Sequence, residues 1–212
     1  MDFATREDAG QKLSRYLLDL KVQPDLVLGL PRGGVVVAAE VARLLRLPLG
    51  VLVVRKIGHP RFREFAVGAL AEPDVVILDT HSIATTGVVR EELDEVIAEE
   101  RQRLKEYQYR FEHPRTPELA DQRVLLVDDG LATGASMEAA VAAAKSRSAR
   151  QVIVAVPVAS DQAVHRLERV ADRVLAYFSD PDFDAVGRYY QRFPQTTDEE
   201  VIALLQASRH CP

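Results

Sequence analysis

The chain of 212 residues, 47% of them hydrophobic, is long enough for one well-packed domain and too short for two ordinary ones. A formal charge of -5 gives no electrostatic reason to expect a nucleic-acid-binding protein, although a local basic site is compatible with an acidic whole. A single cysteine, Cys211, and the lack of any apolar run of membrane-spanning length exclude a disulfide framework, a thiolate metal cluster and a membrane protein, so we expect a cytoplasmic location.

Apolar, β-branched runs alternate with segments of helical period, a pattern typical of a parallel sheet with helices on both faces. The predicted strands are 25–30, 49–56, 123–129, 151–158 and 173–178. One helix is predicted to open at Thr5, whose hydroxyl can act as a cap with Asp8 three residues on. The other predicted helices are 34–47, 87–110, 135–148, 161–171 and 196–208, the last with a capping box from Thr196 to Glu199. The predicted fold class is α/β, with a five-stranded parallel sheet.

The connection between the second and third strands, 57–122, begins with a segment too long for a tight turn. Its glycine and proline residues predict a mobile loop over about 55–66, and its apolar runs predict a short hairpin over about 65–80. Residues 1–178 would then form the core, and residues 179–212 a small C-terminal hood segment with a helix.

The carboxyl ends of the predicted strands are the places to look for a ligand site, because open α/β sheets bind ligands there. After the buried run VLLV, the chain continues with Asp128 and Asp129. Carboxylates at a strand end can accept hydrogen bonds from vicinal hydroxyls or bind a hard cation. The two together suit a ribose diol with magnesium.

The residues after the acids lead into an alanine-rich helix and include Gly130, Thr133, Gly134 and Ser136. Exposed amides, the positive end of the helix dipole and two hydroxyls can hold a phosphate there. Any four of these residues alone would be explained better by an acidic turn and a helix cap. The full order of strand, acids, hydroxyl loop and helix favours a ribose-phosphate cradle.

The complete stretch VLLVDDGLATGAS, 124–136, resembles the 5-phosphoribosyl-1-pyrophosphate (PRPP) signature of the type I phosphoribosyltransferases. The resemblance implies that Asp128 and Asp129 hold the ribose hydroxyls and Mg²⁺, the cofactor. It also implies a loop that holds the 5-phosphate: Ala132, Thr133, Gly134, Ala135 and Ser136. Family members usually have a second glycine where this chain has Ala135, a change that a helix start should tolerate. The resemblance runs more loosely from the first strand to about residue 178.

The segment GLPRGG, 29–34, resembles the family's pyrophosphate loop, in which glycines let backbone amides approach the leaving group. Alone, PRGG would fit a simple strand-to-helix turn equally well. The residues implied to bind pyrophosphate are Arg32, Gly33, Gly34, Arg55 and Lys56. Arg32 and Lys56 are also the implied catalytic residues, because they would stabilise the departing pyrophosphate.

The segment RKIGHPRFR, 55–63, gathers basic residues inside an acidic protein, which is costly unless an anion is sometimes present. It resembles the flexible loop that closes over PRPP in this family, and closure would exclude water from a cationic ribosyl centre. The alternative is a solvated basic loop without a ligand.

The hood segment SDPDFDAVGRYYQRF, 179–193, combines acids and aromatics beyond the last strand. Four aromatic side chains there could stack on a planar acceptor: Tyr177, Phe178, Phe183 and Tyr189. They could equally pack the C-terminal helix.

The resemblance implies a phosphoribosyltransferase that uses Mg-PRPP and a small nitrogenous acceptor, with a nucleobase as the expected class. Ala132 occupies the loop position where transferases for hypoxanthine and guanine carry an aspartate, so 6-oxopurines are expected to be poor acceptors. The rival hypothesis is a PRPP-sensing regulator that binds nucleic acid, against which the net acidity counts. A sugar-phosphate hydrolase or other transferase fits GLPRGG less well. The sequence does not determine the oligomeric state, and a homodimer is one possibility.

Overall fold

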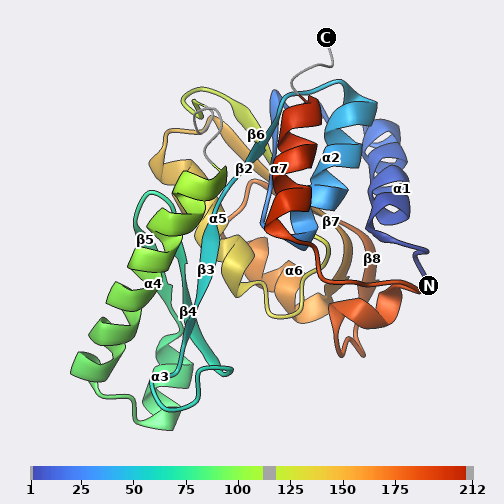
Figure 1. Cartoon of the computed structure of the whole chain (residues 1–212). Helices are drawn as coiled ribbons and strands as arrows, with labels where there is room; N and C mark the ends of the chain where they lie inside the picture. Colours follow the sequence, from blue (N-terminus) through green and yellow to red (C-terminus); the bar gives the residue numbers. More distant parts are fainter. Residues whose placement is uncertain (1, 112–117, 209–212) are drawn as a thin grey trace.

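The computed structural model of the chain describes residues 2–111 and 118–208, and Cys211 lies outside these ranges. A parallel sheet of five strands in the order β2-β1-β6-β7-β8 organises the described residues (Figure 1). Its strands are β1 (Leu26–Gly29), β2 (Leu49–Val51), β6 (Arg123–Val127), β7 (Gln151–Ser160) and β8 (Arg173–Asp180). The central strands β1 and β6 are almost wholly buried, as expected where helices cover both faces of a sheet. The predicted fold class is confirmed.

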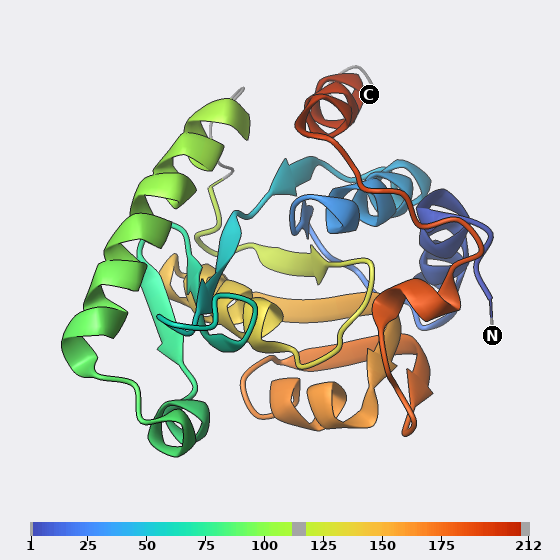
Figure 2. The same ribbon diagram turned by 60° about the horizontal axis from the view of Figure 1, so that its bottom comes forward.

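One face of this sheet is covered by α1 (Arg6–Asp19) and α2 (Gly33–Leu45) (Figure 2). Leu13 and Leu17 of α1 recur at a four-residue spacing and are fully buried with Val41 of α2. The hydroxyl of Thr5 caps α1 by accepting a hydrogen bond from the amide of Asp8 at 3.3 Å, which confirms the predicted helix start.

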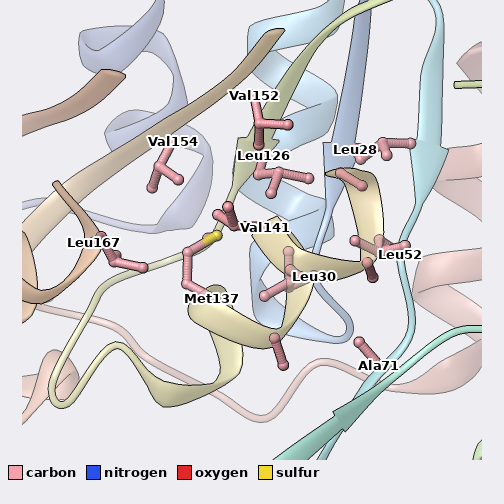
Figure 3. Close-up of a cluster of buried hydrophobic side chains, with 14 of the residues drawn as sticks. Leu28, Leu30, Leu52, Ala71, Leu126, Met137, Val141, Val152, Val154 and Leu167 are labelled. Carbon is pink, nitrogen blue, oxygen red and sulfur yellow. The ribbon is translucent and has the colours of Figure 1, made fainter. Parts of the chain in front are cut away.

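The other face is covered by α5 (Ala135–Ser146) and α6 (Asp161–Leu167). Met137 and Val141 of α5 pack into a cluster with Leu126 and Val154 of the sheet (Figure 3). Because burying aliphatic side chains contributes about 1.5–3 kcal/mol each, this cluster anchors α5 firmly behind the ends of β6 and β7.

A second, antiparallel sheet of three strands lies beyond α5, in the order β3-β4-β5. Its strands are β3 (Val54–Gly58), β4 (Ala66–Ala71) and β5 (Val75–Leu78). The helix α4 (Arg90–Phe111) packs on β3 and β4, with Leu93, Ile97 and Leu104 turned inward. The predicted hairpin over 65–80 corresponds to β4 and β5.

The predicted single strand over 49–56 is wrong, because the chain changes sheets within it. Residues 49–51 form the edge strand β2 of the parallel sheet, and Val54 begins β3 of the antiparallel sheet. Between them Leu52 and Val53 are buried without belonging to either strand. A continuous apolar run such as LGVLVV, 49–54, carries no mark of the point where it leaves one sheet for another.

One additional helix and several helix boundaries also differ from prediction. A short helix, α3 (Thr80–Thr86), is absent from the prediction; Asp79 caps it by accepting hydrogen bonds from the amides of His81 and Ser82. The helix α4 starts at Arg90 rather than 87, and α6 ends at Leu167 rather than 171. No helix within 2–111 or 118–208 has the length and apolar composition needed to cross a membrane.

The last part of the described chain returns across the molecule after β8. It forms a 3₁₀ turn, η1 (Val186–Tyr189), then an extended segment, 190–197, here named the strap, and finally α7 (Asp198–Ser208). The strap runs past the start of α1, and α7 lies beside α2 (Figures 1 and 2). The backbone amide of Phe3 donates to Tyr189 at 2.7 Å, and that of Gln191 donates to Phe3 at 2.8 Å.

The capping box of α7 lies one residue later than predicted. The amide of Glu200 donates to the hydroxyl of Thr197 at 3.2 Å, and the amide of Thr197 donates to the Glu200 carboxylate at 2.8 Å. Thr196 and Glu199, the predicted pair, are therefore not the box. Two threonines in a row made both alignments available, and the helix starts after the second.

Candidate functional site

The acid pair, Asp128 and Asp129, lies directly after β6, at the carboxyl edge of the parallel sheet. One carboxylate oxygen of Asp128 accepts the amide of Asp129 at 2.8 Å. Burial raises the pKa of Asp128 well above its usual range, and the neighbouring charge of Asp129 adds to the effect. Burial also raises the pKa of Asp129, although the guanidinium of Arg6 opposes this. A bound cation or hydrogen-bond donor would therefore stabilise the charged form of the pair.

The PRGG segment, here named the glycine loop although Gly33 and Gly34 already form the start of α2, lies against the acid pair. It does so because β1 and β6 are paired in parallel and end together, with Gly29 opposite Val127. A Cβ atom on Gly33 would lie 2.1 Å from a carboxylate oxygen of Asp129. One on Gly34 would lie 2.6 Å from a carboxylate oxygen of Asp128. Only glycine allows the backbone to approach this closely, so the loop and the acids form one site. The peptide bond between Pro31 and Arg32 is cis.

The hydroxyl loop connects the acid pair to α5 and is fixed from β7. The amide of Leu131 donates to Val158 at 2.9 Å, and the hydroxyl of Ser160 donates to the carbonyl of Ala132 at 2.6 Å. Gly134 has a left-handed φ of 75°, which favours glycine, and α5 starts at the next residue. Gly134 brings no side chain to cap this helix, and the first amide of α5, that of Ala135, donates to the hydroxyl of Thr133 at 3.5 Å. So long a hydrogen bond is weak, and a phosphate bound beside Thr133 and Ser136 could replace it.

Arg32 belongs to the same loop, but its side chain is directed toward the C-terminal helix. One guanidinium nitrogen lies 3.8 Å from the carboxylate of Asp198, in the first turn of α7. Asp198 also pairs with Arg110 of α4. The side chain of Arg32 is 41% exposed, so it is accessible to an anion bound at the loop.

Arg55 and Lys56 lie in β3. They were predicted both at the end of strand 49–56 and at the start of the mobile loop over about 55–66, and the structure places them in the strand. The guanidinium of Arg55 donates to the carboxylate of Glu100 in α4 at 2.9 Å, and the ammonium of Lys56 donates to the carbonyl of Glu64 at 3.1 Å. Within the described ranges, no hydrogen bond or ion pair joins either residue to the acid pair.

The basic loop that follows, residues 59–65, has counter-charges that the sequence did not reveal. Arg61 pairs with Glu92 at 3.1 Å, and Arg63 pairs with Glu99 at 3.1 Å, both acids lying on α4. The argument that this cluster requires an anion is therefore wrong, because α4 supplies the negative charge. The mobility of the loop stays a prediction.

The four aromatic residues proposed for the acceptor belong to one cluster that includes Phe3 and Tyr190 and no residue of α7. The ring of Tyr177 lies 6.1 Å from that of Phe3 and 5.7 Å from that of Tyr16. Phe183 stacks on Tyr189 at 5.2 Å, and Phe178 is tilted against the same ring at 6.1 Å. Their role in acceptor binding stays a prediction.

Two residues that contact the acid pair were missed. Arg6 donates from its Nε atom to a carboxylate oxygen of Asp129 at 2.7 Å. The hydroxyl of Tyr190 donates to the backbone carbonyl of Asp129 at 2.6 Å, and burial raises the pKa of Tyr190. Arg6 did leave a signal, because a basic residue in the first turn of a helix is unfavourable unless it has an acidic partner elsewhere.

Sequence comparison supports the resemblance over most of the chain. Residues 6–185 match a family model described as the phosphoribosyl transferase domain. This chain belongs to the phosphoribosyl transferase family. The recognition made from the 124–136 stretch is thereby confirmed at the level of the family.

Several known proteins are similar to this phosphoribosyl transferase domain. Two proteins of Mycobacterium tuberculosis, MT0597 and Rv0571c, each provisionally named a phosphoribosyl transferase, are 42% identical over 208 residues, which is 96% of this chain. The chain spans about half, 46%, of the length of these curated relatives. The crystal structure of TT1426 from Thermus thermophilus has a TM-score of 0.82 and 43% identity, and the match covers 98% of this chain and 99% of that one.

Proposed function

We propose that this chain transfers the phosphoribosyl group of Mg-PRPP to a nitrogenous acceptor and releases pyrophosphate. The observation that carries the proposal is the contact between the glycine loop and the acid pair, with Gly33 and Gly34 too close to Asp129 and Asp128 for any Cβ atom. The start of α5, which Gly134 leaves without a side-chain cap, follows the same acids along the chain. A molecule with a pyrophosphate, a ribose diol and a 5-phosphate matches these three features in order.

Each part of the site would bind one part of PRPP. Asp128 and Asp129 would accept hydrogen bonds from the two ribose hydroxyls. The amides and hydroxyls of residues 132–136 would hold the 5-phosphate at the positive end of α5. The amides of Gly33 and Gly34 would approach the pyrophosphate, with Arg32 as a charged donor.

Magnesium fits the acid pair chemically, since a hard cation prefers carboxylate oxygens and commonly shares them with substrate oxygens. No group of three or more acidic, histidine or cysteine side chains that could hold a metal occurs in the part of the chain that the structure describes. Asp128 and Asp129 would therefore hold the ion together with PRPP, and the ion would neutralise charge on the pyrophosphate.

The reaction breaks the bond between C1 of the ribose and the pyrophosphate oxygen, and the electron pair leaves with pyrophosphate. The lone pair of the acceptor nitrogen then forms the new bond to C1, with inversion, and an N–H acceptor gives up its proton to water or to the departing pyrophosphate. Positive charge grows on the ribose and negative charge on pyrophosphate, so donors placed at the pyrophosphate accelerate the step. Arg32 and Lys56 are the candidates, and each would exchange its present partner, Asp198 or Glu64, for the substrate.

The identity of the acceptor is addressed by Ala132, which can accept neither a proton nor a hydrogen bond through its side chain. We expect hypoxanthine and guanine to be poor acceptors, with a loss of efficiency of up to ~10⁴-fold relative to a base that the site can hydrogen-bond. Initial rates with hypoxanthine, guanine, adenine, uracil and orotate would test this. A preference for hypoxanthine or guanine would contradict the argument.

The decisive experiment for the function itself is pyrophosphate release. The chain would be titrated with PRPP in the presence and absence of magnesium by calorimetry, and then incubated with PRPP and a panel of nucleobases and amines. Magnesium-dependent binding and acceptor-dependent release of pyrophosphate are expected. Binding without release for any acceptor would favour the PRPP-sensing regulator, and absence of binding would reject both.

A further inference from the structure

Arg6 is a buried charge at the centre of the contacts around the acid pair. The residue is only 8% exposed, and it is the first residue of α1. Burial of an arginine destabilises the folded state unless its charge is paired and its N–H groups are hydrogen-bonded. The partners of Arg6 therefore explain why it is tolerated at this position. Here the partners come from distant parts of the chain.

The first partner is the carboxylate of Asp129. The Nε atom of Arg6 lies 2.7 Å from its Oδ2 atom, and the side chains are 9% and 15% exposed. A charge-assisted hydrogen bond in so dry a setting is directional and strong compared with a surface ion pair. It fixes the orientation of the carboxylate that is proposed to receive a ribose hydroxyl.

The second contact is with the glycine loop. A Cβ atom built on Gly33 would lie 2.7 Å from the Nε atom of Arg6 and 3.0 Å from an Nη atom. The guanidinium therefore lies immediately beside the backbone of the loop that is proposed to bind pyrophosphate, and one side chain touches both halves of the site.

The third contact is with the strap. A second nitrogen of Arg6 donates to the carbonyl of Pro194 at 2.7 Å, and its guanidinium carbon lies 3.7 Å from the centre of the Phe193 ring. The planar fork of arginine allows it to serve Asp129, Pro194 and the ring face at once, which lysine cannot do. Tyr190, also in the strap, holds the backbone of Asp129.

We propose that Arg6 is a positioning residue that fixes the Asp129 carboxylate for ribose binding and makes its position depend on the strap. This inference rests on the proposed function, because it concerns the affinity for PRPP. It assigns to residues 193 and 194 a task in holding the acid pair, beyond any part that the hood takes in acceptor recognition. Arg6 itself would not touch the substrate.

A double-mutant cycle tests the proposal through the binding of PRPP with magnesium. Arg6→Met, Asp129→Asn and the double variant would be compared with the unchanged chain by calorimetry. If Arg6 acts through Asp129, Arg6→Met should weaken binding by about 10-fold in the unchanged chain and by less than about 2-fold beside Asp129→Asn. Equal losses in both backgrounds would overturn the proposal, because a general loss of structure would act in either.

Arg101→Met is the matched control. Its Nε atom also lies 2.7 Å from an aspartate oxygen, that of Asp74, but the two side chains are 45% and 57% exposed. Arg101 lies in α4 and Asp74 lies between β4 and β5, so neither belongs to the parallel sheet. It should leave PRPP affinity unchanged. Phe193→Leu removes only the ring face and should weaken binding by about 3-fold, again only while Asp129 is present. No loss with Phe193→Leu would remove the strap from the proposal.

If Arg6→Met does not fold, Arg6→Lys can take its place in the cycle, because lysine keeps the positive charge. We expect affinity between those of the unchanged chain and Arg6→Met. The two proposals fail in different ways. If the unchanged chain does not bind PRPP, the proposed function fails and this inference with it; if it binds PRPP and the cycle is additive, only the role of Arg6 is rejected.

Discussion

Two regions of the molecule pair arginines with carboxylates, and they do so under opposite conditions. At the edge of the parallel sheet, Arg6 and Asp129 are 9% and 15% exposed and are enclosed by a glycine loop and the strap. Along α4, Arg61 and Arg63 meet Glu92 and Glu99 with roughly half of each side chain in water. Because the first pair is buried, it fixes the relative orientation of its two side chains. In the exposed pairs, the arginines could leave their glutamates for an incoming anion at little cost in free energy. Proximity of opposite charges alone would not distinguish them.

The largest effect on stability and on PRPP binding is expected from adding a side-chain atom to the closely packed buried region. Gly34→Ala would place its Cβ atom 2.6 Å from the Asp128 carboxylate and 2.8 Å from the Asp128 Cα atom. We expect a loss of about 3 kcal/mol in the free energy of unfolding, since backbone must move, and at least ~100-fold weaker PRPP binding. Denaturant unfolding and calorimetry would measure the two losses. The control is Gly87→Ala near α4, in open space with a φ of 65°, where only about 1 kcal/mol of backbone strain is expected. Equal losses would contradict the close packing.

Removing the charge of the acid pair should come next. Asp128→Asn with Asp129→Asn keeps the shape but removes both negative charges and replaces one acceptor oxygen of each side chain with an NH₂ donor. The contacts to ribose hydroxyls and magnesium lose their charge assistance, so PRPP binding should weaken by at least about 2 kcal/mol, or ~30-fold. The corresponding change in the exposed region, Glu92→Gln with Glu99→Gln, should not weaken it. Calorimetry on folded variants decides, and an unchanged affinity in the first variant would exclude the acid pair from the site.

A smaller effect is expected for Lys56, whose ammonium would have to leave the carbonyl of Glu64 in the basic loop before it could reach the pyrophosphate. Lys56→Ala should lower turnover by about 10-fold and leave the affinity for ribose 5-phosphate unchanged, because the lysine is assigned to pyrophosphate. Lys145→Ala, at the distant end of α5, serves as the control. Steady-state kinetics and calorimetry separate the two quantities. Equal losses in both would mean that Lys56 serves the ribose end of the site instead.

The smallest effect is expected for the exposed pairs themselves. Arg63→Gln removes the 3.1 Å pair with Glu99 and should change the free energy of unfolding by less than ~0.5 kcal/mol, decreasing further with added salt. Urea unfolding at low and high salt would measure it. A loss as large as that of a buried pair would show that the loop is fixed to α4 and is no candidate for closure.

The sequence predicted the features that are local and missed those that join distant segments. The acids and the hydroxyl loop follow one another within 124–136, so their order alone indicated a cradle. The glycine loop came from a separate motif and reaches the acids through the parallel pairing of β1 with β6. Arg6 lies 123 residues before its partner, and no periodic pattern connects the two.

The errors have related causes. The change of sheet between Val51 and Val54 was hidden because residues 49–54 form one continuous apolar run and the two residues between the strands are buried. The helix over 87–110 was predicted without any partner for its acids, and the structure brings Glu92 and Glu99 to the basic loop. In both cases the sequence pattern identified the residue types but could not predict which distant residues they would contact in the fold.

The packing of α5 between the two sheets has a consequence for the candidate site at the start of this helix. It separates two sheets, and its buried face toward them is made largely of alanines, Ala139, Ala140, Ala143 and Ala144, against Ala69 and Ala71 of β4. The methyl groups of these alanines thus set the distance between the antiparallel sheet and the parallel sheet. A single added methylene there would work as a wedge, moving the basic loop relative to the acid pair without touching either one.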